Sequence, residues 1–225
     1  MNDEKGTICF SKYLTKMVLL FLSFALIFPA FTKVEANETV VTQNAHLSEK
    51  AVQFKWDMRK LWLDHSLWTG RYVVSALAGL EDQEKVLARL LKTMDDTGNL
   101  IKPYYGEEAG NKLGQLLREH ILLAGKVVAA AKSGNQADLK KFNKEWYKNA
   151  DDITDFLAKA NPNYNKNELR EALHMHLKMI TDTVVARLKK DWDADILAFD
   201  KNEDHLIKLA DTLSEGIIKQ FPNNF

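Results

Sequence analysis

Apolar residues recur every three or four positions through most of the chain after residue 48. This spacing places them on one face of an α-helix, and no stretch shows the strict alternation that is typical of a β-strand. Segments rich in Gly, Pro and Asn separate the periodic stretches. The pattern predicts six helices, which cover residues 48–78, 82–96, 107–131, 136–159, 167–198 and 200–220.

The predicted fold class is all-α, with an antiparallel four-helix-bundle-like core and two additional shorter helices. Residues 97–106 form the expected loop before the third helix, and Asp200 or Asn202 is the expected N-cap of the last one. No internal repeat or low-complexity tract interrupts the pattern. Residues 48–225 are therefore expected to form a single helical-bundle domain.

Residues 1–36 have the pattern of a secretory signal peptide. Lysines give this segment a basic start, an apolar run follows over residues 17–31, and Ala36 provides a small residue for cleavage. The apolar run is shorter than the ~20 residues that a transmembrane helix requires. We therefore expect cleavage and no transmembrane span afterwards, with retention of the segment as an anchor as the alternative.

Cleavage would leave a flexible, polar N-terminal tail over residues 37–47. The expected location is secreted or extracytoplasmic, with association with the cell envelope left open. The only cysteine, Cys9, precedes the apolar run, so the exported chain would depend on packing rather than on disulfide bonds.

Charge and motifs exclude several classes of function. The chain has 31 basic and 31 acidic residues, a formal net charge of zero, and no basic patch interleaved with aromatic residues. Nucleic acid is therefore not an expected partner. No serine lies in a G-x-S-x-G turn, and no glycine-rich phosphate loop follows a strand. The histidines are left as the candidate chemistry.

The segment "LREALHMHLKMITDTV" contains His174 and His176, two positions apart. On a helix such residues point about 200° apart, so they cannot bind one ion together. His176 continues the apolar face of Leu173 and Ile180, whereas His174 falls on the polar face. The spacing predicts one inward and one outward histidine.

Two other predicted helices also carry a histidine on the apolar face. His65 belongs to the apolar face of residues 48–78, and His120 to that of residues 107–131. A buried imidazole without a hydrogen-bond partner costs about 1–3 kcal/mol. Histidines from the middle of three antiparallel helices could meet at one level and satisfy this requirement by binding a metal ion.

Neutral imidazoles are suitable ligands for zinc, copper or iron. We expect His65, His120 and His176 as metal ligands, with Asp152 at the edge of its helix face as a fourth. The outer shell or rim of the site is expected to include Glu119, Asn149, Asp96, Arg71, Thr69 and Tyr105.

Three functions follow from this site. The first is an exported, non-enzymatic protein that binds a transition metal or a metal-centred cofactor, with haem as a variant. The second is a cell-envelope structural or interaction module whose buried polar network holds no metal. The third is a metal-dependent hydrolase or transferase, but its candidate base Glu119 points about 100° away from His120. A metal ion or small ligand is the expected partner.

Several short motifs resemble a family of small exported helical proteins of spore-forming Gram-positive bacteria. They span most of residues 37–225 and read "WTGRY", "DDTGNLIKPYYGEEAG", "LLREHI", "WYKNADDITDFL", "NPNY", "DWDADI" and "GIIKQFP". The motif positions that the resemblance implies are Trp62, His65, Thr69, Glu119, His120, Asp151, Asp152, His176 and His205.

The resemblance implies a helical fold and no particular activity. Members sometimes carry the labels glycosyltransferase or acetylglutamate kinase, but both activities use nucleotide-binding α/β folds, which this sequence does not predict. The chain also departs from the family at Gly70. The family places an arginine directly after the threonine that matches Thr69, whereas here the arginine is Arg71, about 100° further around the helix.

Overall fold

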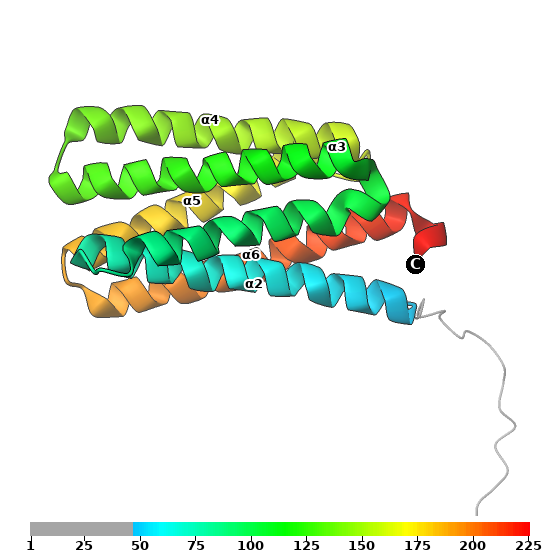
Figure 1. Ribbon diagram of the computed structural model, residues 1–225, viewed down its shortest axis with the longest axis horizontal. Coiled ribbons are helices and arrows are strands. Elements are labelled where there is room, and N and C mark those ends of the chain that lie inside the picture. The colour runs from blue at the N-terminus through cyan, green and yellow to red at the C-terminus, as the bar shows by residue number, and fades with distance from the viewer. Residues whose placement is uncertain (1–46) are drawn as a thin grey trace, which may run out of the picture. The chain divides into compact units, whose positions relative to one another are not determined.

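The computed structural model describes residues 47–225, and this part of the chain is all-α (Figure 1). The predicted signal peptide and all but the last residue of the predicted tail lie outside it. Within residues 47–225, no helix is both long enough and apolar enough to cross a membrane. The helices are α2 (Glu49–Ala78), α3 (Gln83–Ser133), α4 (Gln136–Ala160), α5 (Lys166–Leu188) and α6 (Trp192–Gln220), followed by the 3-10 helix η1 (Pro222–Asn224).

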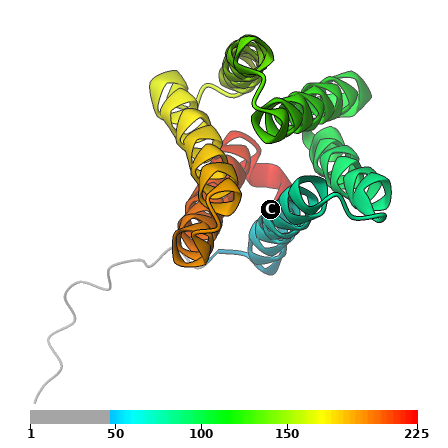
Figure 2. The ribbon, with the colours of Figure 1, turned by 90° about the vertical axis from the view of Figure 1, so that its left-hand side faces the viewer.

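The helices of residues 47–225 form a ring in which neighbours in the sequence are neighbours in space (Figure 2). α2 packs on α3, α3 on α4, α4 on α5 and α5 on α6, and α6 closes the ring against α2. Two ion pairs, Lys55 with Glu215 and Arg59 with Asp211, show that α2 and α6 are antiparallel. Apolar side chains from α2 through α6 meet in one buried core.

Polar side chains set where α2, α4 and α5 begin. The Ser48 hydroxyl accepts from the Ala51 backbone N–H at 3.1 Å, which confirms the predicted start of the first helix. Asn135 and Asn165 cap α4 and α5 in the same way. Each cap satisfies a backbone N–H that has no partner within the helix.

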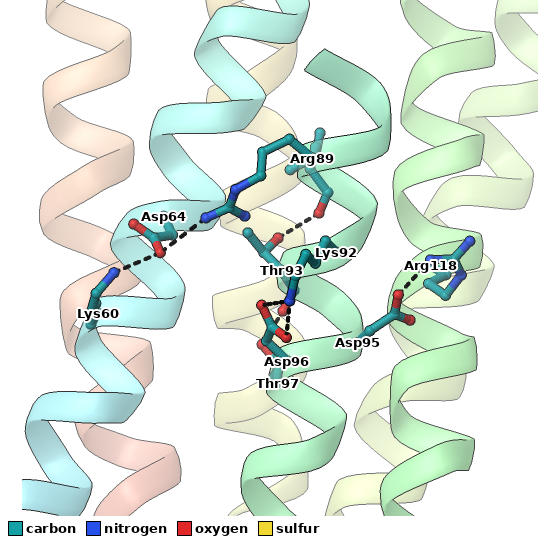
Figure 3. Close-up of polar contacts among 10 residues, drawn as sticks. Lys60, Asp64, Arg89, Lys92, Thr93, Asp95, Asp96, Thr97 and Arg118 are labelled. Carbon is teal, nitrogen blue, oxygen red and sulfur yellow. Dashed lines mark hydrogen bonds and ion pairs between the residues drawn. The ribbon is translucent and has the colours of Figure 1, made fainter. Parts of the chain in front are cut away.

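α3 consists of two antiparallel segments that reverse at Gly106, where φ is 83° and ψ is 169°. Gly98 of the first segment lies against the second so closely that a Cβ there would be 2.5 Å from the Gly110 carbonyl oxygen. Arg118 also donates to Asp95 across the two segments at 2.8 Å (Figure 3). The predicted helix end at residue 96 and the predicted loop over residues 97–106 were wrong. The chain stays helical up to the reversal at Gly106, because Gly98 allows close packing and does not form a turn.

The predicted helix over residues 167–198 was also wrong. α5 ends at Leu188, Lys190 has a positive φ of 60°, and the Asp191 side chain caps α6 by accepting from the Ala194 N–H at 3.1 Å. No glycine or proline marks this break, so the periodicity continued through it. The expected N-cap Asn202 consequently lies in the middle of α6, where it is fully buried.

Gly98 and Gly114 both lie where the two α3 segments pack together, and replacing them is predicted to have different effects on stability. The substitution Gly98→Ala places a methyl group against backbone atoms that cannot rotate away, so we expect a loss of about 1–3 kcal/mol in the free energy of unfolding. Urea unfolding monitored by circular dichroism measures it.

Gly114→Ala is the matched control. A Cβ at Gly114 would meet its nearest atom, the Met94 carbonyl oxygen, at an ordinary 3.6 Å. Because alanine favours helix by up to about 1 kcal/mol over glycine, this variant is expected to be unchanged or more stable. Equal destabilisation by both substitutions would contradict the account of the crossing.

Candidate functional site

Three histidines from three helices meet in the core. His65 of α2, His120 of α3 and His176 of α5 are each at most 5% exposed. The ring centroid of His176 lies 5.3 Å from that of His65 and 6.2 Å from that of His120. All three line a cavity of about 20 Å³. A space of that size holds one water molecule or one ion.

His120 is held by α4 at both ring nitrogens. The indole N–H of Trp146 donates to Nε2 at 3.1 Å, and Nδ1 lies 2.8 Å from the Asn149 side-chain oxygen. The Asn149 amide nitrogen in turn donates to the Leu116 carbonyl at 3.2 Å, which fixes the orientation of the amide. Because an indole N–H can only donate, Nε2 accepts and Nδ1 carries the proton.

His176 and His65 form a second hydrogen-bonded pair. His176 Nδ1 lies 2.7 Å from the side-chain oxygen of Asn202 on α6, so Nδ1 donates and Nε2 accepts. The Nε2 atoms of His176 and His65 are 3.4 Å apart. His65 therefore donates from Nε2, and its Nδ1 faces the Thr69 hydroxyl at 3.5 Å. With this pair, every helix from α2 to α6 contributes to the cluster.

The environment keeps these imidazoles uncharged. Desolvation by burial is the largest cause for all three; it lowers the pKa of His120 to about 3 and that of His176 to about 4. The pKa of His65 is also lowered well below its usual value, by burial first and then by the neighbouring histidines. Hydrogen bonds from His120 to Asn149 and from His176 to Asn202 act in the opposite direction, and they offset only part of the lowering of the two pKa values. All three side chains are neutral at pH 7, which is the form that binds metals.

The predicted carboxylates lie on the surface rather than at the cluster. Asp152 is half-exposed and pairs with Lys148 at 2.7 Å. Asp96 pairs with Lys92 at 2.7 Å on the outer face of α3 (Figure 3). Glu119 is exposed, since it is the residue next to the inward-pointing His120. Helical geometry thus turns each of these side chains away from the cavity.

Two other predicted rim residues also lie elsewhere, whereas Thr69 and Asn149 are in the cluster. The exposed Arg71 guanidinium stacks over the Trp68 ring at 4.9 Å. The Tyr105 hydroxyl donates to Gln220 at 2.7 Å, and accepts from Asn161 at 2.9 Å. Tyr105 therefore belongs to a contact that joins α3 to the ends of α4 and α6.

The other described histidines have separate partners, as expected from the helical pattern. His174 lies 3.0 Å from an Asp151 carboxylate oxygen. His205 donates to the Ala172 carbonyl at 2.7 Å. His46 lies outside the described residues.

Sequence reasoning missed two members of the cluster. Asn202 was taken as a helix cap, because the break before α6 was placed too late. Trp146 is not among the predicted site residues, although its indole N–H is a hydrogen-bond donor. The signal for Trp146 was its spacing of three residues from Asn149, which puts both side chains on the same face of α4.

Within residues 47–225, no group of three or more His, Cys, Asp or Glu side chains is arranged to hold a metal ion. The hydrogen bonds account for this absence. The Trp146 N–H occupies Nε2 of His120, and of the three histidines only His65 and His176 have ring nitrogens that face each other. Comparisons with protein-family profiles, curated proteins and solved structures found no match. The interpretation of the cluster therefore rests on its geometry.

The lowered pKa values predict that the protein loses stability in mild acid. In the unfolded chain the three histidines bind protons near pH 6.5, while in the folded chain they remain neutral down to lower pH. Below pH 6.5 the unfolded state is therefore favoured by proton binding, and the free energy of unfolding falls as the pH falls. We expect a loss of about 2 kcal/mol per histidine by pH 5, measured by urea unfolding.

The variant His65→Gln isolates the contribution of one imidazole. It should reduce the slope of the free energy of unfolding against pH, between pH 6.5 and pH 5, by the contribution of about one bound proton. This holds whatever the effect of the substitution on stability at pH 7.5. A free energy of unfolding that is constant over this interval in the natural protein would show that the buried imidazoles are not held neutral.

Proposed function

We propose that the histidine cluster binds one transition-metal ion, with zinc, copper and iron as the candidates. The observation that carries the proposal is the 3.4 Å distance between the Nε2 atoms of His65 and His176. Two nitrogens that each lie 2.0–2.1 Å from a tetrahedral ion are about 3.3 Å apart. The pair is therefore already spaced as two ligands of one ion.

The hydrogen bonds at the opposite ring atoms support this proposal. Asn149 and Asn202 each accept from the Nδ1 atom of a histidine, at 2.8 Å and 2.7 Å. Such contacts fix the tautomer and the ring orientation of metal-binding histidines, and they leave Nε2 as the ligand atom. His176 and His120 carry the proton on the nitrogen that a metal does not need.

His65 has to move its proton from Nε2 to Nδ1 before it can bind a metal. The Thr69 hydroxyl, 3.5 Å from Nδ1, supports both forms, because a hydroxyl can donate as well as accept. Thr69 lies one helical turn after His65 on α2, so this contact is made within one helix. The site can therefore adopt the tautomer of the metal-bound form without rearranging the backbone.

The cavity favours ion binding over the catalytic and haem alternatives. Its volume of about 20 Å³ suits an ion and is far smaller than a haem macrocycle. The residues that line it include no carboxylate to act as a general base. The proposed role is therefore binding of the ion for storage, transfer or structural use, without a reaction.

The second candidate is a buried polar network that holds no metal and fixes the register of the helices. The observation that favours it is the Trp146 N–H bond to His120 Nε2, which leaves each ring nitrogen of the cluster facing a polar partner in the protein. In this function the helical domain would be a structural or interaction module.

Export is part of the proposal. The signal-peptide pattern of residues 1–36 and the resemblance to exported helical proteins support a secreted or envelope-associated location. In that setting a buried imidazole site would hold its ion within a core built as a four-helix bundle extended by the remaining helical segments.

Metal uptake by protein that carries no histidine tag tests the proposal. The natural chain is expected to bind about one zinc or copper ion per molecule and to gain thermal stability, because a ligand that binds only the folded state stabilises it. Removing one ligand in His176→Ala should abolish stoichiometric uptake. Elemental analysis after dialysis and calorimetric titration measure both quantities.

His174→Ala is the matched control on the same helix. It removes a histidine of the same type two positions away, whose ring faces Asp151 outside the cluster. This variant should bind like the natural protein. Absence of uptake by the natural chain, with unchanged melting on addition of metal, would leave the metal-free network as the function.

A further inference from the structure

Both hydrogen bonds to the His120 ring come from a single helix. Trp146 and Asn149 are separated by one turn of α4, and they hold the two nitrogens of the ring at 3.1 Å and 2.8 Å. His176 differs, because its two nitrogens face separate helices, Asn202 on α6 and His65 on α2. The position of α4 and the state of His120 are therefore linked.

α4 also has the narrowest buried stripe of the five helices. Five of its 25 residues are buried, against eight of 23 in α5, which is shorter still. Two of those five are Trp146 and Asn149, so the contact with His120 is a large share of what α4 buries. Helices with few buried contacts move or open at a lower free-energy cost than those with many.

Metal binding and the indole compete for one atom. Nε2 of a neutral imidazole has a single lone pair, which accepts either the Trp146 N–H or a metal ion. His120 can therefore become the third ligand only when its hydrogen bond to Trp146 breaks. The bond to Asn149 involves the opposite nitrogen and can persist in both states.

We propose that Trp146 competes with the metal for His120 and thereby couples occupancy of the site to the position of α4. This inference rests on the metal-binding function proposed above. Without metal, the indole holds His120 and α4 packs as observed. With metal, the indole leaves Nε2, and the Trp146 end of the contact repacks while Asn149 continues to orient the ring.

The two α4 residues should consequently act in opposite directions on affinity. Trp146→Phe removes the competing N–H and is expected to tighten zinc binding about two- to tenfold, the equivalent of one ordinary hydrogen bond. Asn149→Ala removes the group that orients the ring and should weaken binding about 10- to 100-fold. A purely structural role would change the affinity in the same direction in both variants.

The experiment is a titration of the metal-free natural chain and these variants with zinc, with Trp56→Phe as control. Trp56 is 60% exposed on α2, so its replacement should leave the affinity unchanged. In parallel, ¹⁵N NMR follows the indole N–H signals, of which the one missing in Trp146→Phe identifies Trp146. We expect this signal to shift on zinc binding, with faster amide exchange in α4.

The outcomes separate the two proposals. Zinc binding with equal affinity in the natural chain and Trp146→Phe, together with an unmoved indole signal, overturns the coupling but keeps the metal site. Weaker binding in both α4 variants also overturns the coupling. Zinc uptake by Trp146→Phe alone would overturn metal binding as the function of the natural chain and would show only that the indole blocks His120. Absence of uptake in both the natural chain and Trp146→Phe overturns the metal site and the coupling with it.

Discussion

The requirement that buried imidazoles have hydrogen-bond partners governs how these helices are arranged. Each imidazole nitrogen that is left unpaired in an apolar core costs about 1–3 kcal/mol, and the cluster contains six ring nitrogens. Their partners come from α2, α4, α5 and α6, including Asn149 on α4 and Asn202 on α6, while α3 supplies the His120 ring. A slip of one turn in any helix would break at least one of these contacts. The observed contacts of the cluster therefore require the observed register of the helices.

Helical periodicity was enough to predict the inward face but not the breaks between helices. His65, His120, His176 and Asn149 were identified because a period of 3.6 residues fixes which side chains share a face with apolar neighbours. Their common depth followed from their mid-helix positions in an antiparallel arrangement. The prediction of Asp152 as a ligand was wrong. Asp152 directly precedes the buried Ile153, and one residue step of about 100° turns its side chain to solvent, where it pairs with Lys148.

The errors in the predicted helix ends have two different causes. Gly98 resembled a helix stop, yet it permits contact with Gly110 at a distance that only glycine allows. Conversely, the break between α5 and α6 contains neither glycine nor proline and depends on a positive φ at Lys190 and the Asp191 cap. The first feature is decided by tertiary packing, and the second by a local cap that no glycine or proline signals. Because the break was placed too late, Asn202 was predicted to cap a helix and not to lie in the core. The pattern therefore did not predict Asn202 as the partner of His176.

The chemistry of the cluster is more specific than helix register requires. A register could be fixed by apolar side chains of the same shape, which are often as stable as a buried polar network. Histidines add sensitivity to mild acid, because burial keeps them neutral while the unfolded chain binds protons. The 3.4 Å spacing of the His65 and His176 Nε2 atoms serves as a hydrogen bond in the metal-free network and also matches two ligands of one ion, and a cavity the size of one water molecule or one ion lies beside them. In the proposed metal-bound state both features would serve the ion, and the Trp146 N–H on His120 would be the group that the ion displaces.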